Sequence, residues 1–316
     1  MRTTKCNVMT LMLLIFFSAL AFAEDVPPSN DIIQMWWIQN SQEKIEISGT
    51  PVMIKLRNKE KAFLVPVFFS RGRNEADRTV LVRPALKEVR EATDPVRRDS
   101  VAHDLNHDGI SEIETCALGS GQGTTDGEKS IVQFEDWKPI VLHRKEFNDN
   151  LGCCGPPGLG CGKCESQEVK WKFIDLDHDG KDDLIEEIII EGGASSNRRN
   201  IKKKIIRKYL FKNNMFIRLN GKQINVTILR QRLLAAGVSP STFSIDGEPL
   251  PTESGGVLDR VSGYWRIRDY DNENFTNDIV FASENEACTY FFDRTMPSYV
   301  PWDNRNFFKQ LNRLEW

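Results

Sequence analysis

Two acidic segments with nearly the same spacing constrain the fold of this chain more than any other feature of its sequence. The better formed segment has acids at alternate positions, then a glycine and a further acid: Asp175, Asp177, Asp179, Gly180 and Asp183. Glycine lets the backbone turn sharply at the sixth position, and the alternate acids can then converge on one point. Both flanks are rich in β-branched and apolar residues, so the segment is predicted to be a loop between two strands.

The same pattern occurs earlier in the chain. Its members are Asp104, Asn106, Asp108, Gly109 and Glu112. Oxygen groups in this number suit Ca²⁺, which takes six to eight oxygen ligands, and the seventh-position carbonyls of Ile110 and Lys181 complete the two predicted sets. Without an ion, the clustered carboxylates would repel one another. His107 and His178 are not counted as ligands, because imidazole is a poor partner for calcium.

A third, degenerate copy is expected near residues 269–278. Its acids are Asp269, Asp271, Glu273 and Asp278. It has one more residue before the last acid and lacks the glycine, so it is the weakest of the three predicted sites.

The EF-hand has the same opening pattern, and Glu186 falls at the twelfth position of the segment that begins at Asp175. The flanks argue against an EF-hand, because residues 170–174 and 184–190 are β-forming and the twelfth residue of the earlier segment is Thr115. An acid at the ninth position between two strands instead resembles the FG-GAP/VCBS repeat family, over about residues 100–283. The resemblance implies propeller-like repeats whose calcium loops tie neighbouring strands, and a role in adhesion, recognition or scaffolding. Such loops surround the ion with protein oxygens, so the calcium is expected to be structural.

The remaining periodicity predicts a mainly β protein of propeller-like or stacked antiparallel repeats with a few short helices. An N-terminal β-rich segment, interpreted as a degenerate blade, is expected at 24–99, the repeat region at 100–300 and a C-terminal helix within 301–316. Helices are predicted at residues 84–92, 227–236 (with Gly237 as the stop) and 304–314. Strands are predicted at residues 51–58, 61–70, 111–118, 130–134, 140–143, 184–191, 205–212, 215–219 and 279–282.

The first 23 residues have the layout of a secretory signal. Arg2 and Lys5 precede an apolar stretch, and Ala21-Phe22-Ala23 forms a small-residue cleavage site. The alternative, a retained anchor, is less favoured because the apolar stretch is short for a membrane span. We therefore expect an exported protein, periplasmic or secreted, that is not an integral membrane protein after cleavage. The net charge of −3 does not indicate a nucleic-acid partner.

Removal of Cys6 with the signal leaves an even number of cysteines, so disulfides are the default expectation in an oxidising compartment. The six are Cys116, Cys153, Cys154, Cys161, Cys164 and Cys288. Four of them lie in a Gly/Pro-rich insert at residues 151–164, which is predicted to be a stapled surface loop. A thiolate metal site or a redox Cys-x-x-Cys pair is the alternative there.

Signals of catalysis are few. Outside the acidic loops only His103 and His143 are left as acid–base candidates, and no nucleophile or phosphate-loop motif accompanies them. The sequence therefore favours a binding module whose partner is another protein or a cell-envelope polymer. The alternative is a secreted or periplasmic hydrolase acting on envelope polymers. The basic segment at 198–208 is interpreted as a half-buried edge strand, or else as a surface for anionic polymers or lipids. Trp36 and Trp37 are interpreted as core residues rather than a recognition patch.

Overall fold

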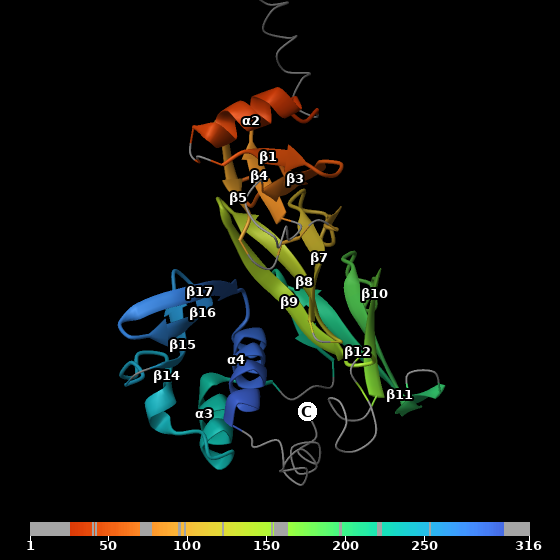
Figure 1. Ribbon diagram of the computed structural model, residues 1–316, viewed down its shortest axis with the longest axis vertical. Coiled ribbons are helices and arrows are strands. Elements are labelled where there is room, and N and C mark those ends of the chain that lie inside the picture. The colour runs from red at the N-terminus through yellow and green to blue at the C-terminus, as the bar shows by residue number, and fades with distance from the viewer. Residues whose placement is uncertain are drawn as a thin grey trace, which may run out of the picture.

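The computed structural model describes residues 26–299 except 40, 42, 70–77, 94–95, 98, 122, 153, 155–163, 196–197, 220–222 and 253. The predicted signal sequence, the predicted helix at 304–314, Cys153 and Cys161 lie outside the described residues. The mainly β architecture is confirmed (Figure 1). Within the described ranges, no helix is both long and apolar enough to cross a membrane.

The N-terminal lobe is a helix packed on a five-stranded sheet. The helix α2 covers Asn30–Ile38, and the strands are β1 (Ile45–Ile47), β2 (Val52–Lys55), β3 (Lys61–Phe69), β4 (Arg78–Arg83) and β5 (Glu88–Glu91). The sheet order is β1-β3-β4-β5, with β2 also paired to β3. Ile33, Trp36 and Trp37 recur at helical spacing and are buried against the sheet. The core interpretation of the two tryptophans is therefore confirmed, although their helix was not predicted.

The helix predicted at 84–92 is wrong. Residues 84–87 form a turn, and β5 pairs with β4 from Arg83↔Glu88 to Val80↔Glu91. Only Val89 of this strand is buried, while Leu86 is exposed, so no continuous apolar stripe is present to hold a helix against the core. Strand pairing then decides the local structure.

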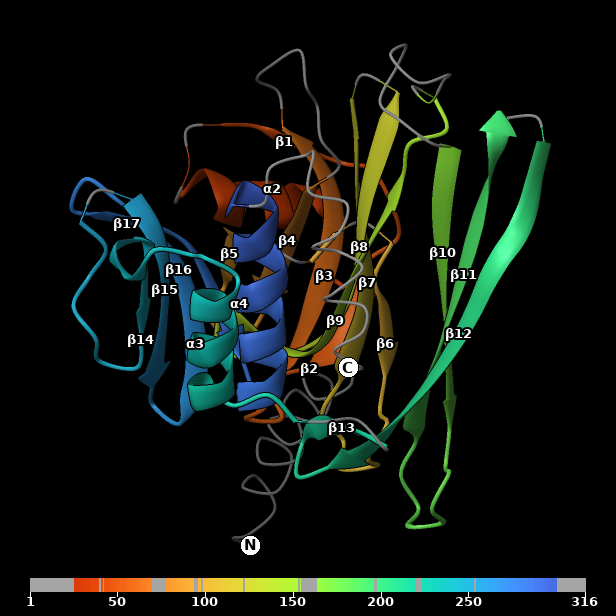
Figure 2. The same cartoon turned by 90° about the horizontal axis from the view of Figure 1, so that it is seen from below.

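Two four-stranded antiparallel meanders follow. The first contains β6 (Val101–His103), β7 (Glu112–Gly121), β8 (Thr124–Glu135) and β9 (Lys138–Asp149). The second contains β10 (Cys164–Ile174), β11 (Asp183–Ser195), β12 (Arg198–Lys212) and β13 (Met215–Arg218). We call β10–β12 the wing; it stands apart from the first meander in Figure 2, and one residue pair, Ser166↔Asp149, joins β10 to β9. In each meander the acidic segment connects the first strand to the second.

The C-terminal lobe packs on the other side of β9. It contains α3 (Val226–Ala235), a 3₁₀ turn (Pro240–Thr242), β14 (Phe243–Ile245), β15 (Ser254–Val261), β16 (Tyr264–Asp271), β17 (Asn274–Phe281) and α4 (Glu284–Tyr299). The prediction of α3 is confirmed: Asn225 caps its start and Gly237, at φ +82°, ends it. Helix α4 was not predicted. It approaches β15 closely at Gly256, where an added Cβ would lie 2.8 Å from the Phe291 ring.

Three apolar clusters hold these parts together. One joins α2 to its sheet, and a large one joins the N-terminal sheet and the first meander to α3, α4 and the C-terminal strands. The third lies at the root of the wing and includes Leu105, Leu142, Leu184, Phe211 and Phe216. Because the third cluster takes residues from both acidic segments or their flanking strands, it fixes the two segments relative to each other.

Candidate functional site

The acidic loop at 175–182 closes the β10–β11 hairpin, whose last pair is Ile174↔Asp183. Asp175 accepts hydrogen bonds from the backbone N–H groups of Asp179 and Gly180, at 3.2 and 3.0 Å. Asp183 is fully buried and accepts from the N–H of Leu176 at 2.8 Å and of Phe211 at 2.7 Å. The carboxylates therefore fold the loop, and Gly180, at φ +83°, allows the turn between them.

Three of these carboxylates converge. One oxygen each from Asp175, Asp177 and Asp183 lies within 4.8 Å of the others. Oxygen donors gathered in this way fit a hard divalent cation such as Ca²⁺. The predicted ligand Asp179 is not in this group.

Lys212, near the end of β12, reaches the same loop. Its Nζ lies 2.6 Å from Oδ2 of Asp177 and 2.6 Å from Oδ2 of Asp179. These contacts lower the pKa of Asp179, with the Lys212 hydrogen bond as the largest cause, and they raise the pKa of Lys212. A cation of the protein itself therefore partly neutralises the loop.

The loop at 104–111 repeats this internal bonding. The first-position acid Asp104 accepts from the N–H of Gly109, and Asp108 accepts from the N–H of Ile110 at 2.7 Å. The ninth-position acid Glu112 accepts from the N–H of Leu105 at 2.7 Å, as Asp183 does from Leu176. The fourth-position histidines, His107 and His178, both have positive φ, at 58° and 59°. The two loops thus have one design, although in this first loop the acids do not form a three-carboxylate group of the kind found at Asp175.

Glu112 also begins a chain of hydrogen bonds into the rest of the fold. It accepts from Gln133 at 2.5 Å, Gln133 accepts from Arg57 at 2.9 Å, and Arg57 donates to the hydroxyl of Tyr264. Burial raises the pKa of Glu112, and the hydrogen bonds from Leu105 and Gln133 lower it. Burial has the larger effect, so the pKa rises to about 7.

The two loops lie side by side at one end of their meanders. The N–H of Asp182 donates to the carbonyl of Leu105 at 2.6 Å, and Asn106 donates to the side chain of Asn214 at 3.0 Å. Asn214 belongs to the β12–β13 turn, two residues after Lys212. This turn therefore contacts both loops.

The structure does not bring the acids of the third copy together. Asn272 and Glu273 form a two-residue turn with positive φ between β16 and β17, so no nine-residue loop exists there. Asp269 bonds to Asn277 at 2.5 Å and pairs with Arg294. Asp278 is exposed on β17, and Asp271 ends β16. The short turn, which has room for only two residues, explains the difference from the prediction.

The cysteine prediction has a mixed outcome. Cys154 and Cys164 form a disulfide across ten residues at the edge of the insert. Cys116 and Cys288 are free thiols instead of the predicted disulfide partners; Cys116 lies on β7, and Cys288 is buried in the core on α4. Burial raises the pKa of Cys288 to about 12, which keeps its thiol protonated.

A second charged site lies between β9, β11, β12 and α4, around His143. The ring of His143 is buried, with Nε2 3.2 Å from Glu186 of β11 and Nδ1 3.2 Å from Glu286 of α4. Glu186 is fully buried as well and accepts from Arg207 at 3.2 Å, and from Trp171 and Tyr209 at 3.4 Å. One imidazole thus links both meanders to the C-terminal helix.

The electrostatics of this triad favour the charged forms of His143 and Glu186. Burial alone would lower the pKa of His143, but the charge of Glu286 and hydrogen bonds to both glutamates outweigh it and raise the pKa to about 9. Burial alone would raise the pKa of Glu186, but the hydrogen bond and charge of His143 outweigh it and lower the pKa to about 2. With both nitrogens donating, His143 is an imidazolium at neutral pH.

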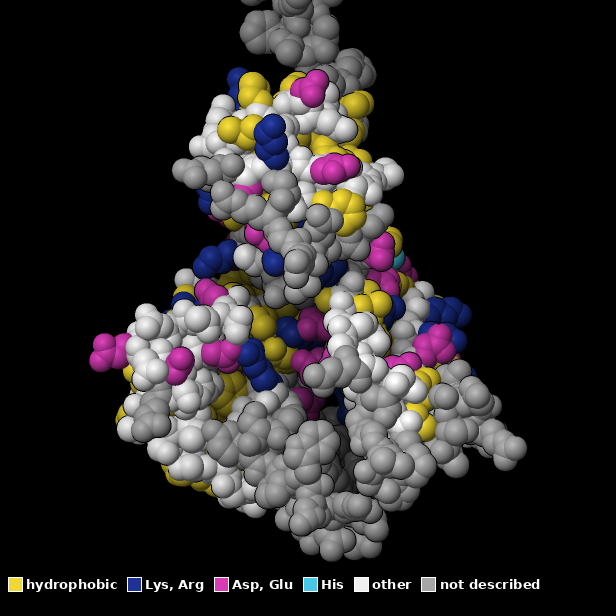
Figure 3. All heavy atoms as spheres, viewed as in Figure 1, with side chains coloured by type: hydrophobic (Ala, Val, Ile, Leu, Met, Phe, Trp, Pro, Cys, Tyr) yellow, Lys and Arg dark blue, Asp and Glu magenta, His cyan; other side chains and the backbone are white. Residues whose placement is uncertain are grey.

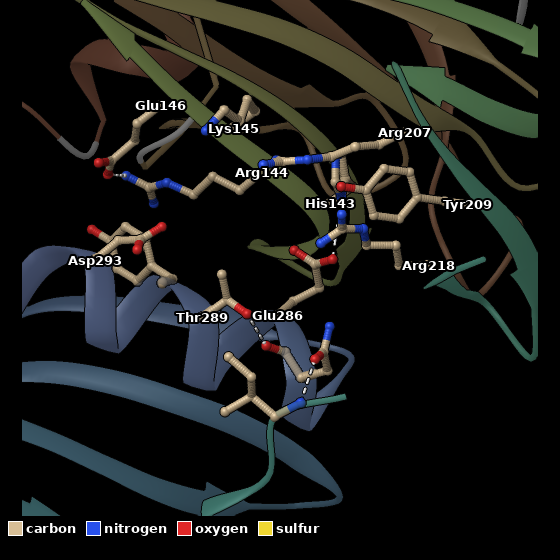
Figure 4. A pocket seen from close by; sticks show the side chains of 13 residues that line it. His143, Arg144, Lys145, Glu146, Arg207, Tyr209, Arg218, Glu286, Thr289 and Asp293 are labelled. Carbon is tan, nitrogen blue, oxygen red and sulfur yellow. Dashed lines mark hydrogen bonds and ion pairs between the residues drawn. The ribbon is translucent and has the colours of Figure 1, made fainter. Parts of the chain in front are cut away.

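A pocket of about 290 Å³ opens beside the triad. Figure 3 shows a hollow between the C-terminal lobe and the wing, with acidic and basic side chains inside it, and Figure 4 shows the lining. Lys145, Arg207 and Arg218 come from the strands, and Glu286, Thr289 and Asp293 come from one face of α4. Sequence reasoning considered His143 but missed the rest of this site.

The other histidine candidate has a different setting. His103 is partly exposed on β6, with Nε2 3.4 Å from Glu114 and its ring against Phe173. The basic segment 198–208 lies on β12. Over these residues β12 pairs with β11, and its pairing with β13 begins at Tyr209. Ile201 and Ile206 are more than half exposed. It is an edge strand as expected, but more exposed than half-buried.

Comparisons with known proteins add little to this picture. No family model matches the sequence, and no curated protein matches it. Among solved structures, a glycosyl hydrolase from Bacteroides ovatus aligns with 74% of this chain and 83% of its own, at 14% identity and a TM-score of 0.13. A score this low does not indicate a shared fold.

Proposed function

We propose that this chain is an exported, calcium-stabilised β-repeat protein that acts as a recognition, adhesion or scaffolding module for another protein or a cell-envelope polymer. The observation that carries the proposal is the convergence of Asp175, Asp177 and Asp183 within 4.8 Å. Calcium bound there would cross-link the start of β11 to the loop and offset the repulsion between the carboxylates.

The second loop supports the same interpretation. In both loops the N–H at position 6 donates to the acid at position 1, and the N–H at position 7 donates to the acid at position 5. In both, the N–H at position 2 donates to the acid at position 9. Two loops of one design on equivalent hairpins favour repeated units. We infer that the meanders β6–β9 and β10–β13 are two blade-like FG-GAP/VCBS repeats of a propeller-like stack.

Export is supported by the chemistry of the chain. The N-terminal signal pattern and the Cys154–Cys164 disulfide both suit an oxidising compartment outside the cytoplasm. In this interpretation the mature chain begins at Glu24.

The geometry favours binding over hydrolysis. Both nitrogens of His143 are held by carboxylates, so the ring cannot accept a proton from a substrate without breaking a buried ion pair. His103 is paired with Glu114, and no nucleophile motif accompanies either histidine.

The test is the melting temperature of the oxidised mature chain in millimolar calcium and in chelator, with a direct count of bound metal. Binding to the native state alone adds roughly 2.7 kcal/mol at a hundredfold excess over Kd, which corresponds to a rise of several degrees. Magnesium at the same concentration should give a smaller rise, because it requires stricter octahedral geometry.

Asp177→Asn should remove the part of the rise that belongs to this loop, because it deletes an exposed ligand without touching the buried Asp183. Asp182→Asn is the matched control, with the same charge change in the same loop at a position outside the ligand pattern. No calcium-dependent rise and no bound metal in the wild-type chain would refute the proposal.

A further inference from the structure

The pocket beside His143 has two unlike walls. The strand wall carries Lys145 on β9, Arg207 on β12 and Arg218 on β13, and the α4 wall carries Thr289 and Asp293. Glu286, Thr289 and Asp293 lie at helical spacing, so they share one face of α4. The walls face each other across the cavity in Figure 4.

Most charges near the pocket already have partners. His143 pairs with Glu286 and with Oε2 of Glu186. Nη1 of Arg207 pairs with Oε1 of Glu186. At the far end, Arg144 pairs with Glu128 and lies 3.8 Å from Glu146.

The side chains of Lys145 and Arg218 have no hydrogen bond or ion pair with another described residue. The Nε–H of Arg207 is buried and has no partner among the described residues. A buried, unpaired donor is costly, and it is commonly explained by an absent water, ion or ligand. The strand wall therefore has excess positive charge. On the α4 wall, the side chain of Asp293 has no hydrogen bond or ion pair with another described residue.

We propose that this pocket binds one acidic sugar unit, a ring with a single carboxylate or phosphate group and several hydroxyl groups. The anionic group lies against Lys145, Arg218 and the free edge of Arg207, whose donors match oxyanions. Hydroxyl groups on the opposite side of the ring donate to Asp293 and to the Thr289 oxygen. A cavity of about 290 Å³ is at the small end for ligand pockets, which fits a single unit rather than an oligomer.

The inference deepens the proposed recognition function, on which it rests, by naming the chemistry of the polymer unit. It does not depend on the calcium loops. A chain with Asp177→Asn should lose the part of its calcium-dependent rise in melting temperature that belongs to the Asp175 loop and still bind the sugar acid, so the two proposals fail separately.

The experiment is calorimetric titration of the oxidised mature chain, with calcium present, at low salt and pH 7. Galacturonate and glucose 6-phosphate are the two acidic probes, and galactose is the neutral probe. We expect at least one acid to bind, galactose to bind at least tenfold more weakly, and the affinity to fall as salt is added. The acid that binds more tightly identifies the anionic group as carboxylate or phosphate.

Lys145→Gln and Arg218→Gln should each weaken binding of the acid about tenfold, with melting temperatures close to wild type. Lys170→Gln is the matched control, because Lys170 is an exposed lysine of β10 outside the pocket. Failure of the wild-type chain to bind either acid would overturn the proposal. Binding by the folded pocket variants with wild-type affinity would overturn it as well.

Discussion

The buried triad of Glu186, His143 and Glu286 makes a quantitative prediction. Replacing His143 with Asn removes the cation that lies 3.2 Å from each carboxylate. Glu186 keeps its contact with Arg207, but Glu286 loses its charged partner. Breaking a buried pair by removing one member typically costs about 3–5 kcal/mol.

The pH dependence of the folding stability gives an independent value for the contribution of the His143 charge. The pKa of His143 rises from its ordinary value of 6.5 to about 9, and each unit corresponds to about 1.36 kcal/mol, so protonation contributes about 3 kcal/mol to folding. Because the pKa in the folded state is the higher one, this contribution is fully present below pH 6.5. It is lost as the pH rises through 9.

The assay is urea unfolding followed by tryptophan fluorescence at several values between pH 6 and pH 9.5. The free energy of unfolding of wild type minus that of His143→Asn should fall by about 3 kcal/mol across this range. Taking the difference removes groups that titrate alike in both proteins. His103→Asn is the control, because the partly exposed pair of His103 with Glu114 should contribute less than about 1 kcal/mol.

Two outcomes would refute this reasoning. One is a loss of unfolding free energy in His143→Asn at pH 6.5 that is no larger than the loss in His103→Asn. The other is a pH-independent difference between wild type and variant. Restoration of stability in the double variant with Glu286→Gln would show that the cost comes from the unpaired carboxylate.

Two further predictions concern the calcium loop and the α4 interface. Lys212→Met should raise the calcium affinity measured by calorimetry roughly tenfold, because calcium no longer competes with the ammonium group for two carboxylates. Lys208→Met is the control and should not change the affinity, because Lys208 is an exposed lysine of the same strand. Gly256→Ala should lower the free energy of unfolding by about 1–3 kcal/mol in urea titration, because its Cβ would lie 2.8 Å from the Phe291 ring, whereas Gly119→Ala should have little effect.

The two acidic loops and many of the strands were predictable because their signals are local, whereas β4, β15 and β16 were not predicted. Alternate acids, glycine at the sixth position and apolar flanks all lie within about ten residues, and the loop hydrogen bonds run between those same residues. The third copy was overpredicted for the same reason. There a similar run of acids lies along a hairpin with a two-residue turn, so the acids are not gathered in a nine-residue loop.

The pocket could not be predicted, because its members meet only in the tertiary structure. His143 and Glu286 are 143 residues apart, and Glu186 had a sequence signal only as the twelfth residue of an EF-hand pattern. Helix α4 did leave a signal: Ser283 and Glu286 have capping-box spacing, and the Glu286 N–H donates to the Ser283 hydroxyl at 3.2 Å. The Glu286 side chain bonds to His143 instead of completing that motif.

The chain of hydrogen bonds from Glu112 through Gln133 and Arg57 to Tyr264 has a consequence for the order of assembly. Its links span 21, 76 and 207 residues of sequence. Contacts of such high sequence separation form late, because the intervening chain must first be brought together. During synthesis from the N-terminus, the first loop can close on its own backbone, but its ninth acid acquires the complete network only after residue 264 has been made. The hydrogen bonds of this loop are therefore complete only when the chain has folded as far as Tyr264.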